Sequence, residues 1–256
     1  MKSGIEEIAR LMKDARSILF ITGAGISADS GLPTYRGIGG LYNDTATDEG
    51  IPIETALAGE MLETRPEVTW KYLSQIEARC RKARYNRGHE VIALAGKEFE
   101  RVCVLTQNID GFHHAAGSKN VIDIHGNMYD IYCAKCGWKR TLIDYQNMEI
   151  PPQCPKCSNI ARPDVVFFGE MLSAAKCDKL AQELALGFDL YFSIGTTSVF
   201  PYIAQPILNA RYMRKPTIEI NPSNTEVSNF IDIKLQMKAA DALDAIWKAY
   251  AQDHKN

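Results

Sequence analysis

A glycine-rich turn directly after an apolar run constrains this chain more than any other feature. Residues 18–21 are all apolar and include β-branched side chains, as expected of a strand buried on both faces. Gly23 and Gly25 follow at once, and Ala28 completes the spacing G-x-G-x-x-A. Because glycine permits close backbone approach, such a turn can present N–H groups to a phosphate. The turn therefore predicts either a dinucleotide pyrophosphate site at the carboxyl edge of a first strand or a tight strand-to-helix turn without a ligand.

Apolar strands alternate with helical patterns along most of the chain. We expect further strands at 102–106, 121–124, 165–168, 190–194, 217–220 and 231–235, and helices at 3–15, 53–64, 66–84, 173–185, 202–213 and 239–251. This alternation predicts an α/β fold with a Rossmann-like, doubly wound parallel sheet. Residues 127–162 interrupt the alternation and predict a small, loop-rich module inserted into the larger domain.

The overall charge and composition argue against several classes of partner. The 256 residues carry a formal net charge of -2, so no strong field would attract nucleic acid or an anionic membrane. No apolar run approaches the ~20 residues that cross a bilayer, and the first residues lack the apolar core of a signal peptide. Three of the seven cysteines stand alone, which favours a reducing compartment. We therefore expect a cytoplasmic protein without nucleic-acid or membrane partners; the sequence does not specify its oligomeric state.

The other four cysteines form two C-x-x-C pairs within the inserted module. Cys133 and Cys136 are separated by seventeen residues from Cys154 and Cys157. This spacing is typical of a four-thiolate zinc site, in which the sulfurs saturate the metal and leave no position for a reactive water. The expected role is therefore structural. Disulfides conflict with the reducing compartment, and an iron–sulfur cluster more often uses other spacings.

Polar side chains follow the strands expected at 102–106 and 121–124. Gln107, Asn108 and Asp110 come after the first, and His125 comes after the second, followed by Gly126. The carboxyl ends of parallel strands bind ligands in such folds, and an imidazole titrates near neutral pH, as a general base requires. Two alternatives stay open: Asp110 as a helix N-cap, and His125 as a hydrogen-bonded core histidine.

Small hydroxyls and amides also follow the strands expected at 190–194 and 217–220. They are Gly195, Thr196 and Ser198 after the former and Asn221 after the latter. Together with the first turn they would line both halves of one nucleotide crevice. The acidic ribose ligand usual ~20 residues after the glycines is not evident, which argues against a hydride-transfer dehydrogenase.

These pieces, in this order, resemble the sirtuin family of NAD-dependent protein lysine deacylases. The segments that carry the resemblance are 23–37, 106–111, 125–126, the four cysteines, 162–170, 195–198 and 220–222, and it extends from about Ser17 to the last helix. The resemblance implies that NAD lies between a large Rossmann-type domain, formed by residues 1–36, 87–126 and 163–256, and a smaller part. The smaller part comprises a cofactor loop with a helical module at 37–86 and the zinc-binding module at 127–162.

The resemblance also assigns roles to individual residues. It implies that His125 is the catalytic base, with Asn108 as a second catalytic residue, and that a peptide strand pairs with Val166, Phe168, Gly169 and Glu170. Zn²⁺ would bind the four cysteines. The residues implied in NAD binding are Gly23, Ala24, Gly25, Tyr35, Arg36, Gln107, Asn108, Ile109, Asp110, Gly195, Thr196, Ser198 and Asn221.

The implied reaction transfers the acyl group of an acyl-lysine peptide or protein to ADP-ribose. The acyl oxygen attacks C1′ of the nicotinamide ribose, nicotinamide leaves, and His125 accepts a proton from the ribose hydroxyls. Members that prefer succinyl or malonyl groups carry a Tyr-x-x-Arg pair where this chain has Leu73 and Ile76. We therefore expect neutral acyl groups, acetyl first. A protein mono-ADP-ribosyltransferase is the alternative, and a non-enzymatic NAD-sensing or scaffold module is a more distant one.

Overall fold

The larger lobe is built on a six-stranded parallel sheet. The computed structural model describes residues 2–33 and 47–253. The strand order is β3-β2-β1-β7-β8-β9, which is the doubly wound order that reverses beside the first strand. Ligands bind such sheets at this reversal, here between β1 and β7. The bounds are β1 Ser17–Thr22, β2 Arg101–Thr106, β3 Val121–Asp123, β7 Leu190–Ile194, β8 Thr217–Ile220 and β9 Ile233–Leu235.

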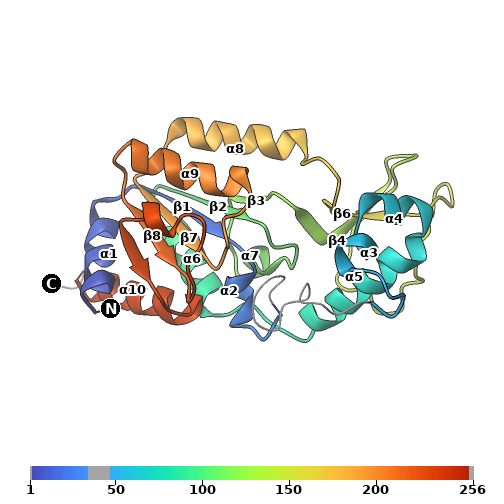
Figure 1. Cartoon of the computed structure of the whole chain (residues 1–256), viewed down its shortest axis with the longest axis horizontal. Helices are drawn as coiled ribbons and strands as arrows, with labels where there is room; N and C mark the ends of the chain where they lie inside the picture. Colours follow the sequence, from blue (N-terminus) through green and yellow to red (C-terminus); the bar gives the residue numbers. More distant parts are fainter. Residues whose placement is uncertain (1, 34–46, 254–256) are drawn as a thin grey trace.

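Helices cover both faces of this sheet, each over its own apolar cluster. On one side α1 (Lys2–Asp14), α6 (Arg87–Glu98) and α10 (Ala239–Asp253) pack against the sheet. On the other, α8 (Ala174–Leu186) and α9 (Pro201–Tyr212) lie together along the upper edge of Figure 1. Short helical turns α2 (Ala24–Ala28), α7 (Phe112–Ala115) and η1 (Ser228–Phe230) connect the layers. The predicted Rossmann-like architecture is confirmed, although the sequence patterns did not indicate α6.

The smaller lobe lies at the other end of the molecule and combines helices with a second sheet. Helices α3 (Ile53–Ala56), α4 (Gly59–Thr64) and α5 (Pro66–Cys80) pack on a three-stranded antiparallel sheet of order β5-β4-β6 (Figure 1). The strands are β4 Gly126–Tyr132, β5 Lys139–Thr141 and β6 Arg162–Val165. Trp70 and Leu73 of α5 share one apolar cluster with Met128 and Ile131 of β4. The two parts of this lobe therefore share a core.

The strand expected at 165–168 is wrong in position and in partner. The observed strand β6 ends at Val165 and pairs antiparallel with β4, outside the parallel sheet. The apolar run continues beyond it as a connecting segment, in which Val166 N–H donates to the His125 carbonyl over 2.9 Å. The expected helix at 53–64 is also divided, into α3 and α4.

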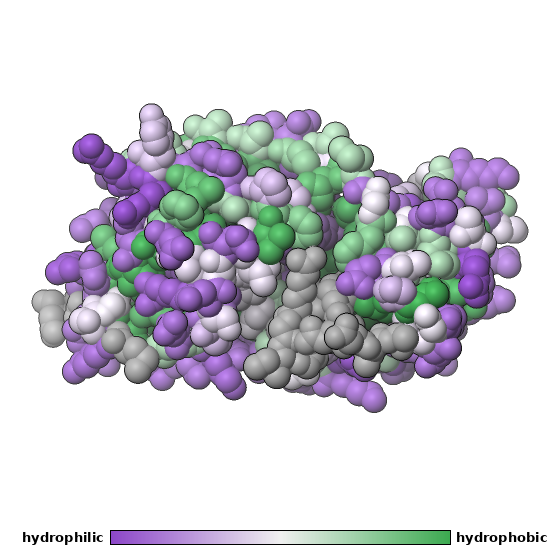
Figure 2. Space-filling model, in the orientation of Figure 1, coloured by the Kyte–Doolittle hydropathy of each residue, from purple (hydrophilic) through white to green (hydrophobic). Residues whose placement is uncertain are grey.

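None of the helices within residues 2–33 and 47–253 is both long and apolar enough to cross a membrane. Figure 2 shows polar side chains over much of the visible surface, with apolar ones interspersed on both lobes.

Candidate active site

The turn after β1 packs directly against the turn after β7. Gly23 N–H donates to the Ile194 carbonyl over 3.0 Å, and Gly25 N–H donates to the Gly195 carbonyl over 2.8 Å. A Cβ at Gly25 would lie 2.5 Å from Gly195 Cα, and one at Gly23 would lie 2.8 Å from Thr196 Cβ. Both glycines are therefore required by contact between the two turns, and their N–H groups are already paired. Of the three turn residues expected at a pyrophosphate, Ala24 lines an adjacent cavity.

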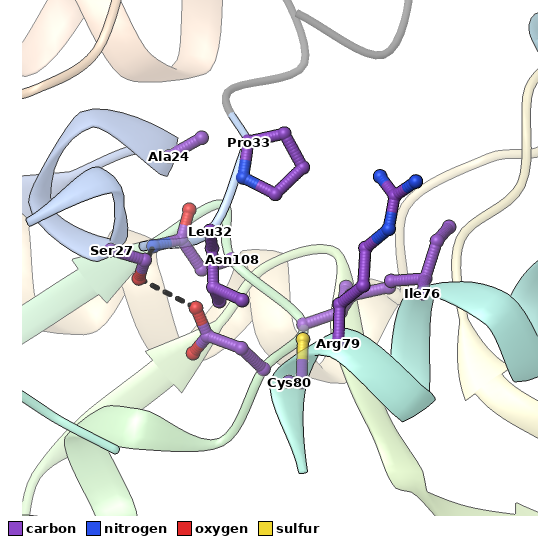
Figure 3. Close-up of a pocket in the computed structure, with 10 residues that line it drawn as sticks. Ala24, Ser27, Leu32, Pro33, Ile76, Arg79, Cys80 and Asn108 are labelled. Atoms are coloured by element: carbon purple, nitrogen blue, oxygen red, sulfur yellow. Dashed lines mark hydrogen bonds between the residues drawn. The ribbon is translucent and has the colours of Figure 1, made fainter. Parts of the chain in front are cut away.

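Asn108 and Asp110 hold the end of β2 against the first turn. The Asn108 amide Nδ2 donates to the Gly23 carbonyl and to Ser27 Oγ, each over 3.1 Å. Ser27 Oγ in turn donates to Asp110 Oδ2 over 2.6 Å, the dashed contact in Figure 3. The other Asp110 oxygen accepts the Phe112 N–H over 2.9 Å. The N-cap of α7 is Gly111, with φ +73°, so the interpretation of Asp110 as a helix N-cap is wrong. Burial raises the pKa of the Asp110 carboxyl.

These residues form one wall of a cavity between the two lobes. Ile109 and Leu32 line it, and the opposite wall comes from α5 (Figure 3). That wall consists of Ile76, Arg79 and Cys80. Figure 3 shows the Arg79 guanidinium directed away from the Ser27–Asp110 contact. The cavity thus combines a largely apolar lining with an amide, a carboxyl and one cation.

His125 occupies the connection between the parallel sheet and β4. It follows β3 and directly precedes Gly126, whose φ is +93°. A Cβ at Gly126 would lie 1.8 Å from the Asp164 carbonyl oxygen, so close pairing of β4 with β6 requires glycine there. The His125 carbonyl accepts Val166 N–H on the same side. The backbone of His125 is therefore fixed by both lobes.

The two ring nitrogens of His125 have different partners. Nδ1 lies 3.1 Å from the Gln107 carbonyl oxygen, which only accepts, so Nδ1 carries the proton. Nε2 lies 2.6 Å from the Tyr202 hydroxyl and accepts a hydrogen bond from it. Burial lowers the pKa of His125 and outweighs the Gln107 carbonyl, which raises it. The imidazole is thus neutral at neutral pH, with its basic nitrogen on the side of Tyr202.

Hydrogen bonds extend from His125 along the carboxyl edge of the sheet. Gln107 Nε2 donates to Thr196 Oγ1 over 2.7 Å, and Asn221 Nδ2 donates to the Thr196 carbonyl over 3.1 Å. Ser198 is buried with φ +56°, and its N–H donates to Thr196 Oγ1 over 3.1 Å. The residues expected to bind the ribose and the adenosine half are therefore contiguous across β2, β7 and β8.

The segment expected to bind peptide is partly committed to contacts within the protein. Phe168 N–H donates to the Leu57 carbonyl and its own carbonyl accepts Gly59 N–H, each over 3.0 Å. The Glu170 carboxylate pairs with Arg162 at 2.8 Å and accepts Phe167 N–H at 3.0 Å. The Glu170 side chain therefore holds this segment in shape.

The four cysteines of the inserted module converge on one point. Their Sγ atoms all lie within 4.8 Å of one another, and Cys133–Cys157 and Cys136–Cys154 are each 3.5 Å apart. A tetrahedral zinc with Zn–S bonds of about 2.3 Å places sulfurs about 3.8 Å apart, so this donor set fits the ion. All four are free thiols, at separations far beyond a disulfide bond of about 2 Å. The disulfide alternative is therefore wrong.

Matching turns position the two cysteine pairs. Cys133 N–H donates to the Trp138 carbonyl, and Cys154 N–H donates to the Asn159 carbonyl, each over 2.7 Å. Each turn is then closed by a residue of positive φ, Gly137 at +71° in the first and Ser158 at +57° in the second.

Sequence reasoning missed the residues that reach the site from a distance. Tyr202 is 77 positions from His125, and Ser27 is 83 from Asp110. No local motif marks either contact, although Ser27 lies within the first turn. Two further predicted residues, Tyr35 and Arg36, lie outside the described residues.

Comparison with known proteins places this geometry in a family. The Sir2 family profile matches residues 23–201. A relative from Pseudomonas aeruginosa, named NAD-dependent protein deacylase 2, is 46% identical over 247 residues that cover 95% of this chain and 96% of that protein. The NAD-dependent protein deacylase of Aquifex aeolicus is 34% identical over 231 residues, covering 90% of this chain and 94% of that one.

Solved structures agree with the sequence relatives. A Sir2 homologue in complex with NAD has a TM-score of 0.87 and 29% identity, with 97% of this chain and 94% of that chain covered. A Sir2 structure with a deacetylated p53 peptide and 3′-O-acetyl ADP-ribose has a TM-score of 0.82 and 27% identity, covering 95% of this chain and 97% of that one. The chain belongs to the Sir2 family, the sirtuins.

Proposed function

We propose that this protein is an NAD-dependent protein lysine deacylase. The observation that carries the proposal is the neutral His125 imidazole, whose Nδ1–H is held by the Gln107 carbonyl at the carboxyl edge of a dinucleotide-binding sheet. The relatives named as deacylases and the Sir2 structures with NAD and with a peptide support the same activity. Substrates of this class are acyl-lysine peptides or proteins.

The residues along the sheet edge fit NAD as the second substrate. We assign Ala24 and the turn around it to the pyrophosphate, and Gly195, Thr196, Ser198 and Asn221 to the adenosine half. Gln107 and Asn108 then meet the ribose next to nicotinamide, and Ile109 with Asp110 forms the nicotinamide pocket. The lining of the cavity by Asn108, Ile109 and Asp110 supports this assignment. NAD supplies an electrophilic C1′ with a cationic leaving group, so the protein needs to orient the reactants and exclude water.

His125 supplies the single base that the reaction requires. Its protonated Nδ1 is fixed by Gln107, so Nε2 is the nitrogen that accepts a proton from a ribose hydroxyl. The lowered pKa keeps the imidazole unprotonated at neutral pH. The hydrogen bonds of Asn108 to Gly23 and Ser27 hold the ribose-binding amide in place.

The segment after β6 offers an edge for the peptide. Within residues 2–33 and 47–253, the Val166 carbonyl and the Gly169 N–H have no hydrogen-bond partner from the protein, while Val166 N–H and both backbone groups of Phe168 do. An extended peptide can pair with these groups through its own backbone, with little demand on its sequence. Because Val166 N–H is bonded to the His125 carbonyl, this pairing brings the peptide next to the base.

Two features of α5 bear on the acyl group. Leu73 and Ile76 are buried within the apolar cluster of the smaller lobe, so they provide no polar partner for an acyl carboxylate. One turn further along, Arg79 lines the cavity. We propose a preference for neutral acyl groups, because neither Leu73 nor Ile76 carries a hydrogen-bond donor. Because the Arg79 guanidinium could pair with an acyl carboxylate, succinyl-lysine is the substrate that tests this preference most sharply.

The proposal is tested by incubating matched acetyl-, butyryl- and succinyl-lysine peptides with NAD and measuring product masses. We expect free lysine peptide, nicotinamide and acyl-ADP-ribose, with acetyl removed faster than succinyl. A peptide that gains the mass of ADP-ribose would instead establish the mono-ADP-ribosyltransferase alternative. Faster succinyl removal would contradict the neutral preference, and its loss in Arg79→Met would assign the acyl carboxylate to that residue.

A further inference from the structure

The hydroxyl of Tyr202 is hydrogen-bonded to His125 Nε2, the nitrogen that acts as the base in the proposed reaction. Its hydroxyl lies 2.6 Å from His125 Nε2, and Nδ1 is already engaged by the Gln107 carbonyl. Because that carbonyl can only accept, the tautomer is fixed and the phenol must be the donor to Nε2. A ribose hydroxyl that gives its proton to His125 needs the same lone pair.

The position of Tyr202 is set by the start of α9. Tyr202 is the second residue of that helix, and the Phe200 carbonyl accepts N–H groups from Ile203 and Ala204 over 2.9 and 3.0 Å. The Phe200 and Tyr202 rings are stacked at 13° with centroids 5.4 Å apart. Both rings meet the imidazole edge-on, at 86° and 83° with centroids 5.8 Å away. An aromatic pair therefore encloses the catalytic ring on one side.

The charged and titratable groups around this contact favour a neutral donor and a neutral acceptor. Burial raises the pKa of Tyr202 to about 12, so its hydroxyl keeps its proton at neutral pH. Lys176 of α8 is the cation that acts on His125 and lowers its pKa, and it pairs with Asp164 at 3.3 Å. The Cys177 thiol, which also belongs to α8, lies near Tyr202 of α9. Among the described residues, no carboxylate acts on the imidazole to favour its protonated form.

We propose that Tyr202 is a positioning residue that caps His125 Nε2 in the free enzyme and gives way to the ribose hydroxyl when the substrates bind. The inference rests on the proposed function for the identity of the incoming hydroxyl, but the cap itself is a property of the free protein. A hydrogen bond to the neutral imidazole stabilises that form, so Tyr202 holds the base unprotonated, in one tautomer and one orientation.

The first test measures His125 directly and needs no catalysis. In NMR titrations of the free protein with labelled histidine, the His125 resonance is assigned by its loss in His125→Gln. Removal of the phenol hydroxyl in Tyr202→Phe should raise the pKa of His125 by about half to one unit, the equivalent of one net hydrogen bond. Tyr212→Phe, an exposed tyrosine at the end of the same helix, is the matched control and should leave that pKa unchanged.

The second test separates the free enzyme from the substrate complex. In Tyr202→Phe, the acidic limb of kcat/KM, which reports the free enzyme, should move to higher pH by the same amount. The acidic limb of kcat should stay in place, because the phenol has already been displaced in the complex. An unchanged His125 pKa in the first test would contradict the role of Tyr202 as a cap on Nε2. A shift of the acidic limbs of both kcat/KM and kcat would contradict displacement of the phenol by the ribose hydroxyl. If the protein proved not to be a deacylase, the first result would still stand.

Discussion

The two lobes reach rigidity by different means. The larger lobe buries both faces of a six-stranded sheet under separate apolar clusters, and hydrogen bonds cross-link its site residues. The smaller lobe has a three-stranded sheet in which all of β5 is exposed, and its distal turns are connected by four converging thiols. A zinc ion held by these thiols would add a cross-link that the apolar cluster of this lobe does not provide. The site lies at the boundary between the two lobes, where Gln107 and Tyr202 contact the His125 ring and Val166 donates to the His125 carbonyl.

Removal of the metal should have the largest effect, and it should destabilise the smaller lobe while leaving the larger lobe folded. A structural zinc contributes about 10 kcal/mol or more to the folding of small domains, so a strong chelator should unfold β4–β6. Hydrogen exchange should show lost amide protection in β4–β6 and in the helices that share their core, with protection kept in β1, β2 and β7. Equal loss in both lobes would contradict the division, as would protection of β4–β6 that survives complete removal of the metal.

Acid should weaken the larger lobe through two buried histidines. His89 and His113 lie with ring centroids 4.9 Å apart, and burial lowers the pKa of His89 to about 4 and that of His113 well below its usual value. Both stay neutral when folded but gain a proton when unfolded below about pH 6.5. Stability should therefore be full above neutral pH and fall as pH drops through 6.5, by about 3 kcal/mol for His89 at pH 4.

Denaturant unfolding between pH 4 and 8 checks this loss against His89→Gln, which should show a shallower decline below pH 6.5. An identical pH dependence in the variant and the native protein would refute the assignment to this pair.

Contact between the two glycine turns should be sensitive to a single methyl group. Gly25→Ala places Cβ 2.5 Å from Gly195 Cα, and overpacking of this kind costs about 1–3 kcal/mol. Gly96→Ala is the matched control, because nothing lies within 4 Å of a Cβ there and helix α6 favours alanine. Unfolding free energies should fall in the first variant and rise slightly in the second. A neutral Gly25→Ala would show that the turns can separate.

Much of the larger lobe could be predicted because buried parallel strands are continuous apolar runs. That signal also misled, since the run at 165–168 is a connecting segment held by His125 and by residues 57–59. Strands β4 and β5 escaped because a half-exposed antiparallel sheet mixes polar and apolar residues. The cysteine spacing predicted its cluster because ligand geometry is local. The Tyr202–His125 contact could not be predicted, because only the folded chain brings α9 to that strand end.

The most direct test of the central claim is His125→Ala, assayed for both turnover and NAD binding. If His125 is the base and the sheet edge binds NAD independently of it, deacylation should fall by about 10²–10⁴-fold or more. Calorimetry should give an NAD affinity within about threefold of the native protein, a change of less than 1 kcal/mol. Turnover near the native rate would contradict the account, and so would loss of NAD binding in a variant that remains folded.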